Sequence, residues 1–235
     1  STKKINEHIQ QLFVRHPNYH ILFSPFEQLL VFLYKKIGKY VPSISVPLVV
    51  SRIKSITSDI ILDLDGGTFS SHAKKRKEAD IKQNINLIGE SLIGEQEANK
   101  RIEAYKKLIN HPEINYISVK ISTLYSQISS LAHEQTIVTL KVKLGILYDQ
   151  VLAVASSTGK KTFINLDMEE YRDLSLTVKL FTSILSDKKY HQLYAGIVLQ
   201  AYVPDSYHHL LDLQTWSTQR VKSGGSPIKV RIVKG

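Results

Sequence analysis

Short apolar runs alternate with longer stretches of helical periodicity from about Asp80 to the end of the chain. Strands that are joined by crossover helices pair in parallel and are buried on both faces, so they read as near-continuous runs of Ile, Val and Leu. The alternation therefore predicts a parallel sheet built from successive βα units. The predicted strands lie at INLIGES (85–91, expected to end at Gly89), NYISVKIS (115–122), KTFINLDMEE (161–170), AGIVLQAYVPDS (195–206) and IKVRIVKG (228–235).

Between these runs, apolar residues recur at three- and four-residue steps, which predicts helices. We expect these helices over about 94–110, 131–156, 174–185 and 204–224. The stripe of the longest one consists of Ile137, Leu140, Leu144, Leu147 and Val151. Gly159 is expected to close that helix, because glycine readily adopts the left-handed conformation of a C-cap.

Residues 1–80 carry helical signals and no strand pattern. One helix is predicted from Pro25 to about Lys36, because proline is favoured in a first turn, and a second is predicted from near Pro47 to Ile60. The sequence DLDGG at 63–67 then predicts a loop, and it lacks the spacing and terminal glutamate of a calcium loop.

Five strands cannot close an eight-stranded αβ barrel, and 235 residues are slightly fewer than the roughly 250 that are typical of a complete one. An apolar strand at the very end of the chain would also leave an unpaired sheet edge. The predicted fold class is therefore α/β, an incomplete (βα)8 TIM-type barrel of about five parallel strands at the front of a longer protein. Residues 1–80 are expected to form a helical N-terminal arm, and residues 81–235 the first part of the barrel.

Polar residues interrupt the apolar runs near the strand ends, where barrels of this kind collect their chemistry. Side chains alternate across a strand, so Lys120 faces away from its aliphatic neighbours, and Asp167 shares a face with Asn165 and Glu169. We expect Lys120, Asp167, Gln200 and Arg231 to converge on one cavity. Lys234 has the opposite parity to Arg231, so it reaches the same cavity only if the strand has ended before it.

A structural ion pair between Lys120 and Asp167 is the alternative interpretation of those two residues. It does not account for Gln200 and Arg231, because polar groups at several strand ends are hard to credit to stability alone.

Composition bounds the class of protein. With 43% hydrophobic residues the chain can bury a sizeable core, and without cysteine it can form neither disulfides nor thiolate metal sites. The histidines show no metal-ligand spacing, so no metal is predicted. The longest apolar stretch, 21–34, is too short and too polar to span a bilayer, and no secretory signal is recognisable. We expect a cytoplasmic protein that at most lies at the inner membrane as a peripheral protein.

The formal net charge of +10 keeps a second class of function open. Basic runs at Lys35–Lys36, at 72–77 (HAKKRK) and at Lys160–Lys161 are compatible with a basic intracellular nucleic-acid-binding or scaffold protein without catalysis. That alternative gives no role to the polar residues at the strand ends, and no nucleic-acid partner is expected for this segment, because aromatic residues are not interleaved with the basic runs. A further alternative is a phosphorylated substrate bound at SSTGKK (156–161), although this sequence lacks the leading glycine and the following hydroxyl of a phosphate loop.

Taken together, five segments resemble the proline dehydrogenase barrel, and they are most similar to the bifunctional bacterial form called proline utilization A. The resemblance runs in the family's order from about Asp80 to the last residue, and residues 1–80 are more weakly similar to the helical arm that precedes that barrel. The segments are NLIGESLIGEQEA (86–98), NYISVKIS (115–122), INLDMEEYRDLSLTV (164–178), GIVLQAYVPDS (196–206) and IKVRIVKG (228–235).

The resemblance implies an FAD enzyme that oxidises L-proline to 1-pyrroline-5-carboxylate and passes electrons to a quinone at the membrane surface. In the bifunctional form, a glutamate semialdehyde dehydrogenase is part of the same protein. Whether the protein forms a homo-oligomer is a question that the resemblance leaves open. The resemblance also implies that Lys120 lies near the proline carboxylate and that Asp167 supports the substrate pocket. Gln200, Arg231 and Lys234 would contact the flavin, with the arginine close to N5, where a fixed positive charge favours the reduced ring.

The chain departs from the family at its end. The paired arginines that clamp the proline carboxylate and the aromatic lid over the proline ring come later in the family's barrel than Gly235. We therefore expect this 235-residue chain alone to be inactive and to bind FAD weakly or not at all.

Overall fold

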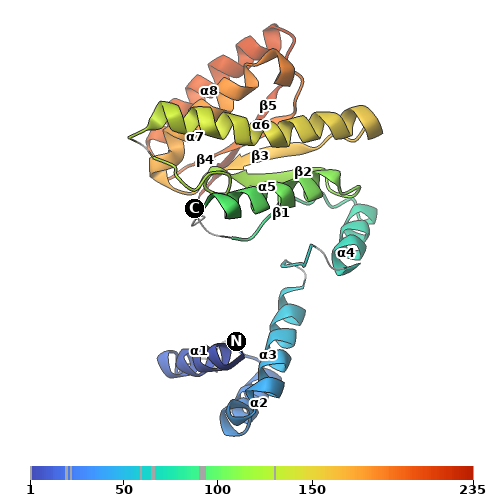
Figure 1. The fold of residues 1–235 in the computed structure, drawn as a ribbon, viewed down its shortest axis with the longest axis vertical. Helices are drawn as coiled ribbons and strands as arrows, with labels where there is room; N and C mark the ends of the chain where they lie inside the picture. Colours follow the sequence, from blue (N-terminus) through green and yellow to red (C-terminus); the bar gives the residue numbers. More distant parts are fainter. Residues whose placement is uncertain are drawn as a thin grey trace. The chain divides into compact units, whose positions relative to one another are not determined.

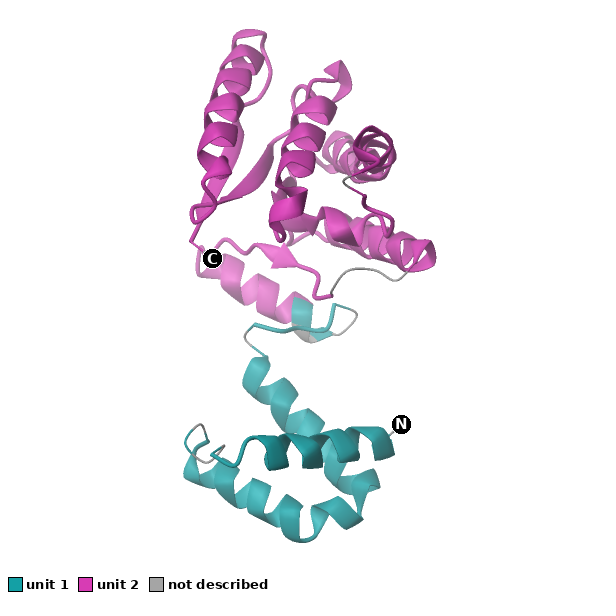
Figure 2. Ribbon diagram, turned by 90° about the vertical axis from the view of Figure 1, so that its left-hand side faces the viewer, with its two compact units in different colours: residues 1–69 teal, residues 70–235 magenta. Residues whose placement is uncertain are grey.

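The computed structural model describes residues 2–18, 21, 23–58, 60–64, 67–89, 94–129 and 131–234. The chain divides into two compact units, Ser1–Phe69 and Ser70–Gly235 (Figure 2). The boundary expected at residue 80 stays a prediction.

The first unit is helical, as expected for the N-terminal region. Its elements are α1 (Thr2–Arg15), α2 (Pro25–Lys36), the 3-10 helix η2 (Gly38–Tyr40) and α3 (Pro42–Thr57). Helix α2 has the predicted bounds because Ser24 and Glu27 form a capping box and Pro25 stands in the first turn. The unit buries little apolar surface, and the side chain of Tyr34 donates to Asn6 Oδ1 at 2.5 Å within it.

Two details of the predicted N-terminal helices are wrong. Helix α3 begins at Pro42 and contains Pro47, because a proline near the start of a helix removes only one hydrogen bond of its ladder. Of the predicted loop at 63–67, Asp63 and Leu64 are non-helical and residues 65 and 66 lie outside the described residues. Gly67 already begins helix α4 (Gly67–Glu78), which carries the basic run HAKKRK.

In the second unit, five parallel strands form one sheet in the order β1-β2-β3-β4-β5, which confirms the predicted α/β architecture (Figure 1). Each of the first four strands is followed by an α-helix, and α5, α6, α7 and α8 pack against one another in series. The strands are β1 (Ile85–Asn86), β2 (Tyr116–Lys120), β3 (Phe163–Asp167), β4 (Ala195–Gln200) and β5 (Ile228–Val233). The α-helices are α5 (Glu95–Asn110), α6 (His133–Thr158), α7 (Leu174–Leu185) and α8 (Asp205–Lys222), and the 3-10 helices are η3 (Ile121–Thr123), η4 (Tyr171–Asp173) and η5 (Lys188–Tyr190).

Strand β1 is much shorter than the apolar run 85–91 predicted. After Asn86 the chain leaves the sheet, and the Ile88 carbonyl accepts a hydrogen bond from Arg101 Nη1 at 2.8 Å instead of pairing with β2. Gly89 has a positive φ of 156° and lies so close to the Arg101 guanidinium that a side chain there would collide with it. Residues 90 and 91 of the predicted strand lie outside the described residues.

The two faces of the sheet differ as the alternation predicted. One face packs against the helices and is aliphatic, with exposed fractions of at most 1% for its central residues. These residues are Ile117, Val119, Ile164, Leu166, Ile197 and Leu199. The predicted apolar stripe of α6 is buried on the same side of the sheet. The polar residues of the strands lie on the opposite face, which we call the inner face.

Lys160 joins two helix ends rather than forming a phosphate loop. Gly159 closes α6 with a φ of 72°, as predicted, which turns Lys160 toward the end of α5. There its Nζ donates to the carbonyls of Ile109, His111 and Ile114 at 2.5, 2.7 and 2.9 Å. Burial lowers the pKa of Lys160 from its usual value. Because the Lys160 ammonium binds backbone carbonyls, a structural role for the segment SSTGKK is favoured over the phosphate-binding alternative.

Replacing Lys160 by methionine is expected to lower the free energy of unfolding by about 2 kcal/mol, because three carbonyls lose a charged donor. Urea unfolding followed by circular dichroism measures the change. Lys161→Met is the control, since the Lys161 ammonium only lies over the Tyr194 ring at 5.5 Å on the surface. Equal losses in both variants would contradict the capping role.

Candidate functional site

Seven polar side chains gather on the inner face where β2, β3, β4 and β5 end. We call them the strand-end cluster: Ser118, Lys120, Asn165, Asp167, Glu169, Gln200 and Arg231. The strand register brings them together, since Lys120 lies opposite Asp167, Arg231 opposite Val198 and Gln200 opposite Val233. In parallel strands, opposite residues point to the same side of the sheet, so side chains from distant parts of the chain meet there.

Asp167 binds three donors through a single oxygen. Its Oδ1 accepts hydrogen bonds from Arg231 Nη2 at 2.7 Å, Asn165 Nδ2 at 2.8 Å and Ser118 Oγ at 3.0 Å. The Asp167 and Arg231 side chains are 14% and 35% exposed, so the ion pair is partly desolvated. Asp167 therefore fixes the direction of the Arg231 guanidinium relative to β2 and β3.

Glu169, two residues further along, binds a second set of groups. Its Oε1 lies 2.5 Å from Lys120 Nζ, and its Oε2 accepts a hydrogen bond from Ser122 Oγ at 2.9 Å. Its backbone carbonyl accepts from Gln200 Nε2 at 3.1 Å. The two carboxylates and the Glu169 backbone carbonyl together connect the ends of four strands.

The structure brings Lys120, Asp167, Gln200 and Arg231 together on one region of the inner face, and that they line one cavity stays a prediction. The alternative of an ion pair between Lys120 and Asp167 is wrong, because each pairs with a different partner although their Cα atoms lie opposite one another. Lys234 is exposed just beyond the last residue of β5, and no contact brings it into the cluster within the described part of the chain.

Three buried polar atoms of the cluster have no hydrogen-bond partner among the described residues: Asn165 Oδ1, Gln200 Oε1 and Arg231 Nε. A buried polar atom without a partner is costly, so these atoms are suited to a ligand that supplies the missing bonds. The set offers a donor on a cationic group and acceptors on amides. A flavin ring, which has hydrogen-bond acceptors along one edge and an N–H donor, fits this set.

Sequence reasoning recognised that Glu169 and Asn165 share a face with Asp167 but did not assign them to the site. The alternation of side chains was the signal that could have included them. Ser118 has the same parity as Lys120, and its hydroxyl also accepts from Asn84 Nδ2 at 2.9 Å. Its role as a donor to Asp167 could not be read from the sequence, because it depends on the register between β2 and β3.

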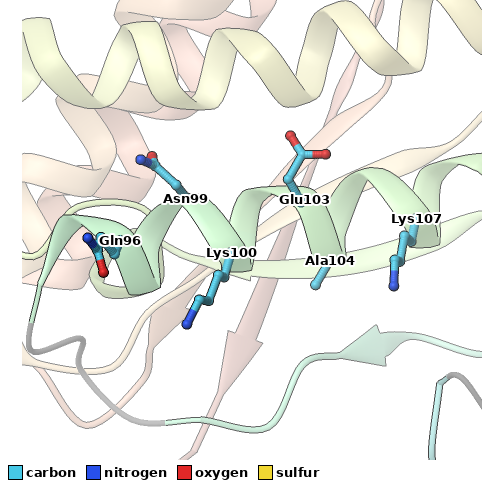
Figure 3. Close-up of a pocket in the computed structure, with 6 residues that line it drawn as sticks. All are labelled: Gln96, Asn99, Lys100, Glu103, Ala104 and Lys107. Atoms are coloured by element: carbon cyan, nitrogen blue, oxygen red, sulfur yellow. The ribbon is translucent and has the colours of Figure 1, made fainter.

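A separate hollow of about 510 Å³ lies along α5 and is not part of the cluster (Figure 3). It is lined by Gln96, Asn99, Lys100, Glu103, Ala104 and Lys107. Figure 3 shows Asn99 and Glu103 pointing to one side of the helix and Lys100 and Lys107 to the other, so these side chains do not converge.

In the ranges that the structure describes, no group of three or more His, Asp or Glu side chains is placed to hold a metal ion. No helix among the same residues combines the length and the hydropathy that a membrane crossing requires.

Comparison with known proteins identifies the family. The proline dehydrogenase family matches residues 69–235. No curated protein matches the chain.

Solved structures of proline utilization A (PutA) are similar to the chain over most of its length. PutA from Corynebacterium freiburgense is 32% identical, with a TM-score of 0.73, over 90% of this chain and 21% of that one. PutA from Bdellovibrio bacteriovorus, inactivated by N-propargylglycine, is 24% identical with a TM-score of 0.68, over 84% and 22%. A mutant PutA from Bradyrhizobium japonicum is 19% identical with a TM-score of 0.61, over 86% and 20%, which supports the fold alone.

The chain spans about a fifth of the length of these structures. The match to the family covers more than half of this chain, and the structure from Corynebacterium freiburgense agrees with it in both fold and sequence. The chain belongs to the proline dehydrogenase family.

Proposed function

We propose that the chain forms part of an FAD-dependent proline dehydrogenase, which oxidises L-proline to 1-pyrroline-5-carboxylate and passes electrons to a quinone. Membership of the family supports the reaction. The observation that carries the proposal is the Arg231 guanidinium, which Asp167 holds in place while its buried Nε is left without a partner among the described residues. The nucleic-acid-binding alternative offers no explanation for this arrangement.

Four residues of the cluster, and Lys234 beside it, have proposed tasks. Lys120 binds the carboxylate of proline, because its ammonium is the cation at the end of β2 and is 21% exposed. Gln200 and Arg231 hold the flavin ring through the atoms that lack partners, and Lys234 extends the same binding surface beyond β5. Asp167 orients Arg231 and thereby supports the pocket. Bound FAD supplies the hydride acceptor for the oxidation.

The charges of the cluster suit this chemistry. A guanidinium in fixed orientation and partly removed from bulk water stabilises negative charge on a neighbouring ring without having to reorganise. A fixed ammonium on the carboxylate holds the substrate in one orientation, which favours reaction at a defined ring carbon. Both cations are paired with carboxylates on β3 or just beyond it, so neither is a buried charge without a partner.

The test compares the gene product that carries this sequence with the 235-residue chain alone. We expect the purified gene product to absorb near 450 nm as a flavoprotein and to reduce an electron-accepting dye with L-proline but not with D-proline. We expect the 235-residue chain to bind FAD weakly or not at all and to show no turnover. A gene product that retains FAD but does not respond to L-proline would overturn the proposed substrate.

A further inference from the structure

Glu169 contacts both proposed binding regions of the cluster, although its own side chain belongs to neither. Its carboxylate binds the Lys120 ammonium at the end of β2 and the Ser122 hydroxyl in η3, which follows β2 directly. Its backbone carbonyl binds the Gln200 amide from the end of β4. Glu169, which follows β3, therefore sets the direction of both the Lys120 ammonium and the Gln200 amide.

These contacts are poorly explained by stability. The Lys120 and Glu169 side chains are 21% and 40% exposed, and ion pairs of such exposure contribute little to the free energy of unfolding. The lysine side chain has four rotatable bonds, so an ammonium without a fixed partner would sample many positions. With one carboxylate oxygen on Lys120 and the other on Ser122 in η3, Glu169 restricts that freedom.

The neighbouring glutamate provides a contrast within the same loop. Glu170 pairs with Arg172 at 2.7 Å, and these side chains are 49% and 70% exposed. Because successive side chains of an extended segment point to opposite sides, Glu170 does not share the parity of Asp167 and Glu169. Two adjacent glutamates thus have different surroundings, and only Glu169 contacts the cluster.

We propose that Glu169 is a positioning residue of the substrate pocket, which orients the Lys120 ammonium toward the carboxylate of an amino-acid substrate and the free oxygen of Gln200 toward the cofactor. The proposal rests on the proposed function of Lys120 and Gln200. The length of the Glu169 side chain matters as well as its charge, because its two carboxylate oxygens must contact Lys120 and Ser122 at the same time.

The kinetic consequence follows from what Lys120 binds. The substrate carboxylate does not react, so its interaction with Lys120 is equally strong in the ground state and in the transition state. Loss of that interaction raises KM and leaves kcat nearly unchanged. A simple charge effect would act in the opposite direction, because removing a negative charge beside Lys120 would strengthen its attraction for a carboxylate.

Two substitutions in the gene product separate reach from charge. Glu169→Asp keeps the charge but is one methylene shorter, and Glu169→Gln keeps the length but removes the charge. We expect both to raise KM for L-proline about tenfold with kcat within about twofold, and to shift the melting temperature by less than about 3 °C. Glu170→Gln is the matched control and should leave both constants unchanged. A normal KM in Glu169→Asp, or a lower KM in Glu169→Gln, would overturn the proposal.

A chemical readout separates this proposal from the proposed function. Mild acylation of the gene product followed by peptide mass spectrometry measures how fast Lys120 reacts, with exposed lysines of the same chain as internal references. Lys120 is expected to react several-fold faster in Glu169→Gln than in the wild type or in Glu170→Gln. If the wild type does not oxidise proline, the proposed function is wrong and the labelling alone decides whether Glu169 holds Lys120. Unchanged labelling of Lys120 would refute the positioning role.

Discussion

Replacing Arg220 by methionine is expected to lower the free energy of unfolding by about 4 kcal/mol. Arg220 lies on α8 and is only 4% exposed, and burial lowers the pKa of its guanidinium from the usual value. The guanidinium donates to four backbone carbonyls, so its removal leaves several buried acceptors without a donor. They are the carbonyls of Leu185, of Tyr190 at 2.9 Å, of His191 at 2.7 Å and of Ser226 at 2.9 Å.

These four acceptors come from the end of α7, from η5 and from the turn that leads into β5. Arg220 therefore fixes the approach to the strand that carries Arg231. Urea unfolding monitored by circular dichroism measures the loss. Lys222→Met on the exposed part of the same helix is the control and should change stability by less than about 0.5 kcal/mol. A loss below about 1 kcal/mol in Arg220→Met would show that the carbonyls find other donors.

The sequence predicted the long helices of the second unit well because their apolar stripes face a single layer. The residues of α6 and α7 that recur at three- and four-residue steps are buried, and Gly159 ends α6 in the left-handed conformation as expected. Strand β1 was predicted too long, because an apolar run does not reveal that the chain leaves the sheet after Asn86, where the Ile88 carbonyl accepts from Arg101 instead. The role of Arg220 could not be predicted, since its acceptors are backbone groups brought together only by the fold.

For the site, the alternation of side chains was sufficient to predict which residues share the inner face. It was not sufficient to predict their partners. Lys120 and Asp167 lie opposite each other in the register, yet the longer reach of lysine takes its ammonium to Glu169, and Arg231 occupies Asp167. Pairing within a cluster of like-oriented side chains depends on side-chain length and direction, which the alternation does not contain.

The second prediction with a large effect concerns the Asp167 carboxylate. Asp167→Asn in the gene product is expected to lower kcat/KM for L-proline by about 100-fold or more, because Arg231 loses both its counter-charge and its orientation. The asparagine oxygen can take the place of the Asp167 oxygen on which three donors converge, but it carries no charge and therefore holds the Arg231 guanidinium less firmly. Proline-dependent dye reduction measures kcat/KM, and the flavin absorbance shows whether the cofactor is retained.

A double-mutant cycle with Arg231→Met decides whether Asp167 acts through the arginine. If Asp167 works by orienting Arg231, each single substitution removes the same interaction, so the double variant should be no slower than the slower single variant. Independent roles would instead multiply the two losses. Asp149→Asn is the control, because Asp149 pairs with Lys189 at 2.6 Å and with Tyr190 at 2.8 Å on the helical side of the sheet, away from the cluster. Multiplicative losses, or a comparable loss in Asp149→Asn, would contradict the direct coupling of Asp167 to Arg231 that the 2.7 Å contact indicates.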